Sequence, residues 1–312
     1  MTQTRHDHAV APAARTPARR GLRLSRFVDR HSVAVLLTPA VAFMLVMMVA
    51  PVAYAMFLSF HEWSGGRTAP SYVGTGNYRR LLADDPRFWA ALRRTAVFTV
   101  AAVGLQTVLG VATALVINRE FFGKKVFRTI FVLPMILTPV AVALLWRLMF
   151  NPQLGVLNYV LSSVGIGDVE WLVNPRLALF SLVIVDVWQF TPLITLIVLA
   201  GLLALPTDVY EAAAIDGASR WRAFWSITLP LLRPVIVIAM IFRAIDALKT
   251  FDSIAVITSG GPGQATETLN FYIYNATFQY QRMGYASALV VVYLILALSV
   301  LLVALRFRRA RR

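Results

Sequence analysis

The sequence predicts an all-α integral membrane protein with six transmembrane helices, and three observations lead to that fold class. The chain has 312 residues, of which 58% are hydrophobic and only 14% are charged, whereas a soluble domain carries about 25% charged residues. The apolar residues fall in runs that are long enough to cross a bilayer. Basic residues cluster at both ends of the chain, directly beside apolar runs, as cytoplasmic flanks do.

The two ends of the chain are expected to lie in the cytoplasm. Residues 1–30 are rich in Arg, Ala and Pro, which predicts a mostly disordered tail, and residues 307–312 form a second basic tail. The first apolar run is too long for a cleaved signal peptide, whose apolar core has about 7–15 residues. We attribute the net charge of +15 to membrane topology and contact with anionic lipid, and not to nucleic-acid binding.

Six apolar segments within a transmembrane domain of residues 31–306 are predicted as spans. They cover residues 33–60, 95–118, 129–150, 177–205, 235–257 and 283–305. Pro134 and Pro139 predict a kink or a break in the third span. An even number of spans places both termini on one side, and 19 of the 30 Lys and Arg residues fall in segments assigned to that side.

Two segments on the opposite side need comment. Loop 61–94 carries six arginines, which is unusual for an outward-facing loop unless Arg93 and Arg94 belong to the following helix. Residues 267–280 have apolar side chains at helical spacing, which predicts an interfacial helix on the outer surface.

The polar segment 206–234 separates the fourth span from the fifth. Thr207 and Ser219 are placed to cap two short helices, and Gly217 between them permits a sharp turn. Two bent helices at the membrane surface suit insertion into a cleft of a partner protein. An ordinary amphipathic helix lying at the interface explains the same pattern equally well.

This segment also carries a family resemblance. Glu211-Ala212-Ala213, Gly217, Ile227 and Leu229-Pro230 match EAA-x3-G-x9-I-x-LP without a gap, which resembles the EAA loop of ABC importer permeases. FRAIDALKTFDSIAVITSGGPG across the fifth span, and GYASAL opening the sixth, are similar to carbohydrate-uptake permeases of the MalF and glycerol-phosphate permease type. The resemblance covers residues 30–306, although loop 151–176 has no room for the large external domain of the MalF maltose permease.

The resemblance implies a six-helix ABC importer permease fold with a cytoplasmic coupling helix, in a bacterial-type cell membrane. It implies three kinds of partner: a second homologous permease subunit, two ATPase subunits and an extracytoplasmic solute-binding protein. Membrane lipid is a fourth partner, expected from the basic flanks. ATP and Mg would be used by the ATPase, so no cofactor is expected in this chain. The residues that would contact or couple to the ATPase are Glu211, Ala212, Ala213, Gly217, Arg220, Arg222, Leu229 and Pro230.

Polar side chains inside the fourth and fifth spans form a second candidate site. Charged groups within spans usually face a cavity, a partner or each other, and a sugar needs donors, acceptors and aromatic faces such as Phe190 or Trp188. With the resemblance, the candidate substrate pathway comprises Asp186, Gln189, Phe190, Leu193, Arg243, Asp246 and Thr250. The alternative is that Arg243, Asp246 and Lys249 only pair along one helix. Gln106, alone on the second span, is expected to hydrogen-bond to another helix.

Other function classes find less support. A self-sufficient secondary transporter or channel would predict inverted repeats, and none is evident. A membrane-embedded enzyme would need clustered carboxylates or histidines, yet the chain has no cysteine, only four histidines and no catalytic motif. The SGGPG turn and loop 61–94 are interpreted by resemblance as contacts for the solute-binding protein, or else as plain solvated turns.

Overall fold

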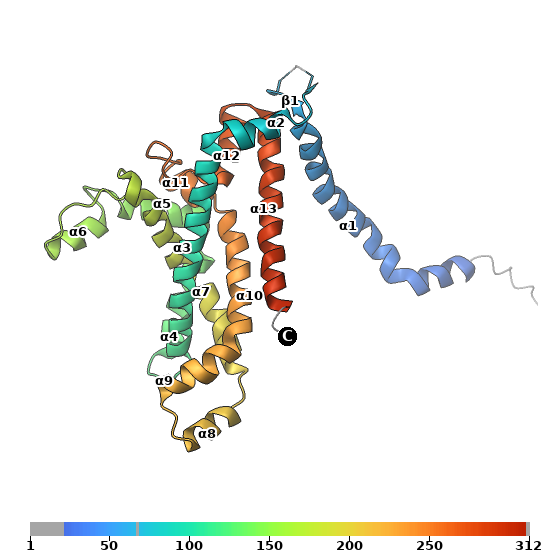
Figure 1. The fold of residues 1–312 in the computed structure, drawn as a ribbon. Coiled ribbons are helices and arrows are strands. Elements are labelled where there is room, and N and C mark those ends of the chain that lie inside the picture. The colour runs from blue at the N-terminus through green and yellow to red at the C-terminus, as the bar shows by residue number, and fades with distance from the viewer. Residues whose placement is uncertain (1–21, 67–68, 310–312) are drawn as a thin grey trace, which may run out of the picture. The chain divides into compact units, whose positions relative to one another are not determined.

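The computed structural model describes residues 22–66 and 69–309, which are mostly helical (Figure 1). The chain divides into two units, residues 1–54 and residues 55–312. Within the described residues, five helices are long and apolar enough to cross a membrane, or six if one sharply bent pair counts as a single span. Five of the six predicted spans overlap these helices, and the third falls on the bent pair.

The first unit is dominated by helix α1, which runs over Leu22–Ser59 and ends in the second unit. Its apolar part, Leu37–Ser59, has the length of a membrane span. The helix begins inside the segment expected to be a disordered tail; Leu and Arg, which are frequent in residues 22–30, are good helix formers. Residues 1–21, the rest of that predicted tail, lie outside the described residues.

Helix α3 (Pro86–Ile117) begins nine residues before the predicted span. Pro86 occupies its first turn, and the side chain of Asp85 accepts hydrogen bonds from the backbone N–H groups of Arg87 and Phe88, so the start is well defined. Half of the arginines that made loop 61–94 unusual therefore belong to this helix. The remaining part of the loop holds a two-stranded antiparallel ribbon, β1 (His61–Glu62) and β2 (Ser71–Tyr72), then α2 (Gly76–Arg79) and a π-helical turn (Arg80–Asp84).

The third predicted span is broken, as its prolines indicated. Helices α4 (Lys124–Ile136) and α5 (Pro139–Met149) meet at an angle of 99°. The break falls at Leu137 and Thr138, both with extended backbone, because a residue before proline avoids the helical conformation. Pro134 remains inside α4. A short helix, α6 (Val156–Ser163), follows in the next loop.

The last three long helices are α7 (Pro175–Leu203), α10 (Leu229–Leu248) and α13 (Met283–Arg309). The predicted fifth span, residues 235–257, extends too far toward the C-terminus. Helix α10 ends at Leu248, and Asp252–Ile257 form a separate helix, α11. Phe251 in the break packs its ring 5.0 Å from that of Tyr274, which turns the chain toward α5 and α7, against which α11 packs. Residues 310–312 of the predicted basic tail lie outside the described residues.

The segment expected to be an interfacial helix is helical but largely buried. Helix α12 (Leu269–Tyr274) continues into a π-helical turn (Asn275–Gln279). Leu269, Phe271 and Tyr272 are inside the core, where α12 packs against α3 and α13. The predicted apolar face comprises Leu269, Phe271, Ile273, Tyr274 and Phe278, of which only Phe278 is exposed.

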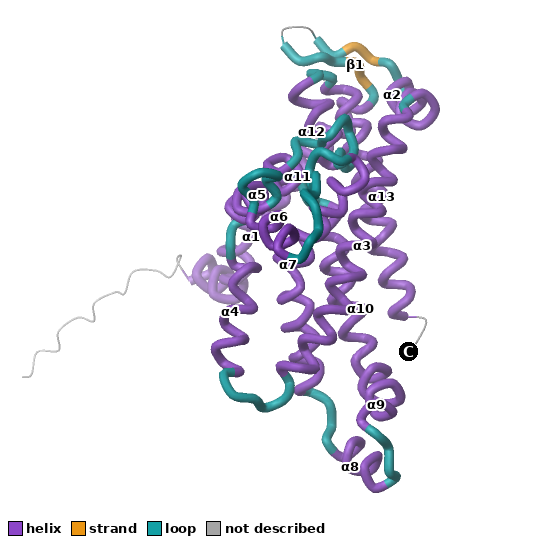
Figure 2. The backbone as a smooth tube through the Cα atoms, turned by 90° about the vertical axis from the view of Figure 1, so that its left-hand side faces the viewer, coloured by secondary structure: helices purple, strands orange, loops and turns teal. Residues whose placement is uncertain are grey.

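Helices α3 and α7 form the most extensive helix pair of the second unit. They contribute to two of its three apolar clusters, one near the middle around Phe98 and Leu182, and one around Ile194 and Leu232. The third cluster, around Phe88 and Leu269, lies at the end where α12 covers α3 (Figure 2). Helices α8 and α9 lie at the opposite end.

Gly110 sets the close approach of α3 and α7. A Cβ at this position would lie 2.8 Å from Cγ2 of Ile194 and 3.3 Å from the backbone nitrogen of Thr195. We expect Gly110→Ala to lower the stability of the purified protein by about 1–3 kcal/mol, because the two helices must move apart. Gly104→Ala on the same helix is the control, since nothing lies within 4 Å of its added Cβ. The melting temperatures of the two variants in detergent give the comparison. Equal melting temperatures for Gly110→Ala and Gly104→Ala would contradict this packing.

Candidate functional site

Residues 206–234, which the family resemblance predicts to couple to an ATPase and which we call the coupling segment, begin with two short helices bent at a glycine. Helix α8 (Asp208–Ile215) and helix α9 (Arg220–Ala223) are joined through Gly217, whose φ of 73° lies in the left-handed region. Ser219 caps α9 by accepting from the backbone N–H of Arg222 at 3.3 Å, as predicted. Thr207 makes no such cap, because its backbone is already helical and its hydroxyl points to Asp208 Oδ1 at 3.5 Å.

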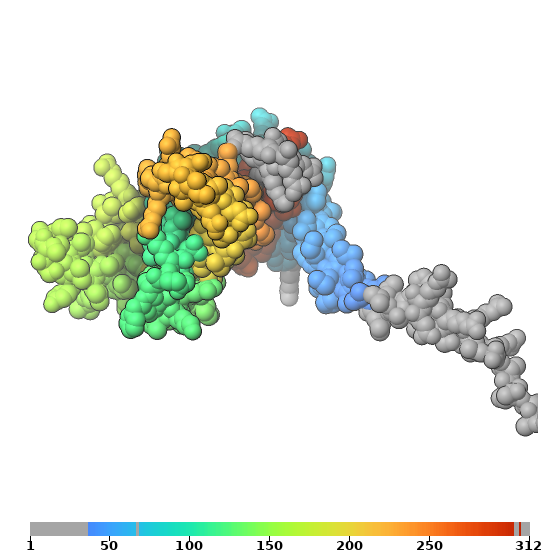
Figure 3. Space-filling model, turned by 90° about the horizontal axis from the view of Figure 1, so that it is seen from below, coloured from blue at the N-terminus to red at the C-terminus, as the bar shows by residue number. Residues whose placement is uncertain are grey.

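Most of the coupling segment is open on its outer side. Helix α8 has no buried residue, and the large apolar side chains of Ile215, Trp221 and Trp225 are exposed. Glu211, Ala212, Arg220 and Arg222 are also exposed, and Ala213 is half-buried. The segment therefore presents both charge and apolar surface at one end of the helices (Figure 3, yellow to orange).

One hydrogen bond ties α8 to the next membrane helix. The hydroxyls of Tyr210 and Thr228 lie 2.9 Å apart, and Thr228 is buried in a π-helical turn (Phe224–Thr228). That turn continues directly into α10, where Leu229 and Pro230 form the first turn. A displacement of α8 would therefore act on the base of α10.

The polar residues of the spans meet in a buried ion cluster, which we define as Gln106, Asp186, Arg243 and Asp246. The guanidinium of Arg243 on α10 donates to Asp186 on α7 and, at 3.0 Å, to Asp246 one turn along its own helix. Gln106 on α3 donates through Nε2 to Asp186 Oδ2 at 2.8 Å and to the Asp186 carbonyl at 2.9 Å, which confirms the predicted helix–helix hydrogen bond.

Burial differs sharply within the cluster. The side chains of Arg243 and Asp186 are 0% and 2% exposed, whereas that of Asp246 is 55% exposed. The face of the Arg243 guanidinium lies over the Phe190 ring, 4.4 Å from its centroid. One buried cation, Arg243, is thus paired with two carboxylates. Only the carboxylate of Asp246 is accessible to solvent.

Three polar atoms around this cluster are buried and unpartnered. They are Nε of Arg243 and Oε1 of Gln106 and of Gln189. Gln189 donates from its other amide atom to the Leu137 carbonyl at 3.3 Å, at the break between α4 and α5. Buried polar atoms normally find partners, so these positions offer one donor and two acceptors to a hydroxyl-bearing ligand or to water.

The remaining predicted pathway residues lie at the edge of this arrangement. Leu193 and Thr250 are half-buried, and Thr250 follows the end of α10. Trp188 packs its ring 5.6 Å from Trp146 rather than beside Arg243. Pairing along α10 is limited to Arg243 and Asp246: among the described residues no ion pair involves Lys249, which is exposed.

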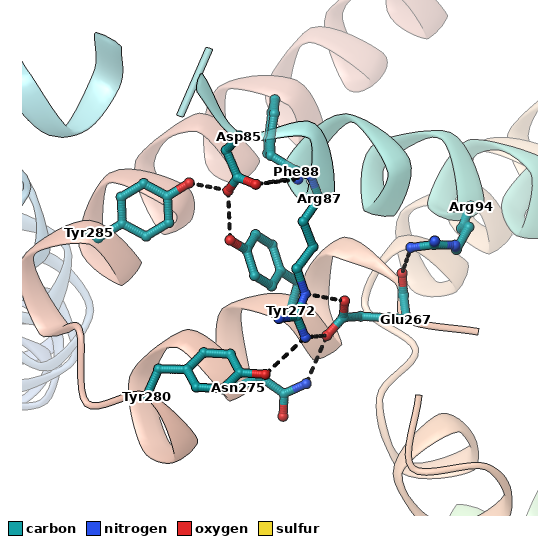
Figure 4. A network of polar contacts seen from close by, with 9 residues as sticks. All are labelled: Asp85, Arg87, Phe88, Arg94, Glu267, Tyr272, Asn275, Tyr280 and Tyr285. Carbon is teal, nitrogen blue, oxygen red and sulfur yellow. Dashed lines mark hydrogen bonds and ion pairs between the residues drawn. The ribbon is translucent and has the colours of Figure 1, made fainter. Parts of the chain in front are cut away.

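A second polar network, absent from the predictions, joins α3, α12 and α13 (Figure 4). We call it the tyrosine clasp: Asp85, Arg87, Glu267, Tyr272, Asn275, Tyr280 and Tyr285. Asp85 accepts from the hydroxyls of Tyr272, at 2.6 Å, and Tyr285. Arg87 binds both oxygens of the buried Glu267 carboxylate at 2.7 Å. Such bidentate pairs are strong and geometrically specific.

The clasp changes the ionisation of its groups. Burial alone would raise the pKa of Asp85, but the hydrogen bonds from Tyr272, Tyr285 and two backbone N–H groups outweigh it, and the pKa lies below its ordinary value. Burial and the hydrogen bond to Asp85 raise the pKa of Tyr272 above its ordinary value, so the phenol stays protonated and donates.

Two features of the sequence could have indicated the clasp. Arg87 and Arg94 are seven residues apart, on one face of a helix, and Glu267 is the only acidic residue after Asp252. Arg94 also reaches the carbonyl of Glu267, at 3.4 Å. With Arg87 counted as loop, this helical spacing was not visible. No group of three or more His, Asp or Glu side chains in the described part of the chain could hold a metal ion.

Comparison with known proteins agrees with this architecture. The family model described as "Binding-protein-dependent transport system inner membrane component" matches residues 106–312. The trehalose/maltose transport system permease protein MalF of Thermococcus litoralis is 40% identical over 277 residues, covering 89% of this chain and 93% of its own. The sulfoquinovosyl glycerol transport system permease protein SmoG of Agrobacterium fabrum is 36% identical over 284 residues, covering 91% and 92%.

Solved structures have the same fold. A chain from a bacterial ABC transporter involved in the import of the acidic polysaccharide alginate superposes with a TM-score of 0.80 at 24% identity, covering 93% of this chain and 99% of that one. A second structure, of the bacterial alginate transporter in complex with an alginate pentasaccharide-bound periplasmic protein, gives a TM-score of 0.78 at 24% identity, over 90% and 96% of the two chains.

We expect Asp85→Asn to destabilise the protein by about 2 kcal/mol at neutral pH, because hydrogen bonds to a charged group are lost. Since the folded protein lowers the pKa of Asp85, its contribution is present above the unfolded value of about 4 and disappears as the pH falls through the folded value. The difference in melting temperature from the unsubstituted protein should therefore narrow below about pH 4. Asp84→Asn, at an exposed neighbour, is the control. A difference that is constant from pH 7 to pH 3 would contradict the clasp.

Proposed function

The chain belongs to the family of inner membrane components of binding-protein-dependent transport systems, and we propose that it is a transmembrane permease subunit of an ABC importer for a carbohydrate. As a member of that family it is a multi-pass membrane protein and a transport component rather than an enzyme. The names of its relatives support a carbohydrate: one is a trehalose/maltose permease and another a sulfoquinovosyl glycerol permease. Its fold is that of an alginate importer chain.

The partners follow from this assignment. The chain works with a second, homologous permease subunit, two ATPase subunits and an extracytoplasmic solute-binding protein. The complex of the similarly folded alginate transporter with its periplasmic protein supports the last of these. ATP and Mg are used by the ATPase subunits, and this chain binds no cofactor. Both termini and the coupling segment face the cytoplasm, in keeping with the positive charge of the terminal segments.

The observation that carries the coupling role is the position of α8. It is an exposed helix that carries the carboxylate of Glu211, three small alanines and, as its last residue, the exposed Ile215. The hydroxyls of Tyr210 and Thr228 tie it to the base of α10. The small residues allow close approach to a groove of the ATPase, and Glu211 pairs with a basic residue there. The bend at Gly217 sets the angle between α8 and the helix that follows.

The buried ion cluster marks the substrate pathway. Arg243 lies on α10, the helix that begins at the coupling segment, so movement of α8 reaches the cluster along one element. Asp246 supplies an accessible carboxylate, and the unpartnered atoms of Gln106, Gln189 and Arg243 suit sugar hydroxyls. Phe190, Leu193 and Thr250 add apolar and hydroxyl contacts at the edge.

Substitutions in the coupling segment test the assignment. We expect Gly217→Val and Glu211→Lys to reduce substrate uptake and binding-protein-stimulated ATP hydrolysis at least tenfold. Valine is strained by about 1–3 kcal/mol at a φ of 73°, and lysine reverses the charge offered to the groove. Gly165→Val is the matched control, because Gly165 also has a positive φ and open space around its Cβ. Unchanged uptake in both coupling variants, or the absence of a co-purifying ATPase subunit, would overturn the proposal.

The pathway assignment is tested at Asp246, the exposed member of the cluster. We expect Asp246→Ala to change the KM for uptake several-fold while assembly with the ATPase stays intact, because Arg243 keeps its buried partner Asp186. Asp252→Ala, an exposed carboxylate on α11, should leave uptake unchanged. Kinetics of Asp246→Ala identical to those of the unsubstituted transporter would remove this residue from the pathway.

A further inference from the structure

The connection between α3 and α4 gathers exposed aromatic and basic side chains. We call residues 118–128 the basic turn. Phe122 is fully exposed and Phe121 partly so, and Gly123, with a φ of 79°, reverses the chain directly before α4. Arg119, Lys125 and Arg128 are exposed as well. Figure 3 shows this end of α4 in green, projecting beside the coupling segment.

The charges of the basic turn are mostly uncompensated. Its one carboxylate, Glu120, pairs with Lys124 at 2.8 Å. Among the described residues no ion pair involves Arg119, Lys125 or Arg128. Three free cations next to an exposed phenylalanine fit a surface that is anionic and also has an apolar layer beneath it.

Helix α4 fixes the depth at which these cations lie. It has no buried residue, and Val126, Ile130 and Leu133 form an exposed apolar stripe along one face. The three side chains recur at helical spacing, as on the apolar face of an interfacial helix, and the first of them, Val126, directly follows Lys125. Because Lys125 and Arg128 occupy the first two turns of a helix whose next turns are apolar, they lie where the chain leaves the hydrocarbon, at the level of lipid phosphates. Arg119 lies in the connection just before this helix.

We propose that the basic turn is a binding site for the headgroups of anionic phospholipids. Lys125 and Arg128, one turn apart on the helix, contact the phosphate, Arg119 adds a third positive charge, and the ring of Phe122 enters the interface below. The apolar stripe that continues from the site along α4 holds the acyl chains. The proposal concerns lipid alone and does not depend on which sugar the transporter carries.

Native mass spectrometry of the purified transporter, with all co-purifying subunits, tests the site. The probes are phosphatidylglycerol and phosphatidylcholine with the same acyl chains, each titrated in detergent. We expect Lys125→Gln/Arg128→Gln to lower retention of phosphatidylglycerol about tenfold, since each basic residue near an anionic surface contributes appreciably, and to leave phosphatidylcholine unchanged. Phe122→Ala should lower the retention of both lipids, because the phenyl ring makes an apolar contact that does not depend on the headgroup charge. Arg128→Gln alone should have an intermediate effect.

A second pair of arginines provides the matched control. Arg79→Gln/Arg80→Gln removes the same charge from exposed positions at the other end of the helices and should retain phosphatidylglycerol normally. Equal loss in both double variants would mean that net charge alone governs binding and would overturn the proposal. Normal retention in Lys125→Gln/Arg128→Gln would also overturn it. The same holds if that variant instead loses its ATPase subunit, because the basic turn would then be a protein contact.

Discussion

The structure depends on the ion pair between Arg243 and Asp186. A cation without counter-charge is costly inside an apolar helix bundle. Separating α10 from α7 at this level would take the Asp186 carboxylate away from the buried guanidinium of Arg243, which would then need another partner. Gln106 extends the constraint to α3 by binding the same carboxylate. Three of the long helices are thereby held at one point, while the large apolar contacts of α3 with α7 lie on either side of it.

The two ends of these helices are fastened in different ways. At one end the tyrosine clasp joins α3, α12 and α13 through hydrogen bonds to charged groups. Asp85 caps α3 and also accepts hydrogen bonds from the hydroxyls of Tyr272 and Tyr285. At the other end helix α8 is tied to the base of α10 through the hydroxyls of Tyr210 and Thr228. The three levels therefore differ in how they are held: a charged hydrogen-bond network at one end, a buried ion pair between, and one pair of hydroxyls at the other end.

Several features could be predicted because their cause is local in sequence. The bend at Gly217 and the cap at Ser219 follow from residue type and spacing, and Pro139 alone explains the break between α4 and α5. The end of α10 was misplaced because the break at Lys249–Phe251 depends on aromatic packing against Tyr274, far along the chain. The same reason hid the pairing of Arg87 with Glu267, 180 residues apart. Helical spacing placed Arg243 and Asp246 on one face, but the partner across the helices, Asp186, required the fold.

The break between α4 and α5 has a consequence for the electrostatics of the interior. A helix that stops inside the apolar region leaves its last carbonyl oxygens without intrahelical partners. At this break the carbonyl oxygen of Leu137 accepts a hydrogen bond from the side-chain amide of Gln189. Gln189 lies one helical turn from Asp186. The bend therefore brings backbone dipoles to the neighbourhood of the ion cluster. It makes that part of the interior hydrophilic through main-chain oxygens, which no side-chain substitution can remove.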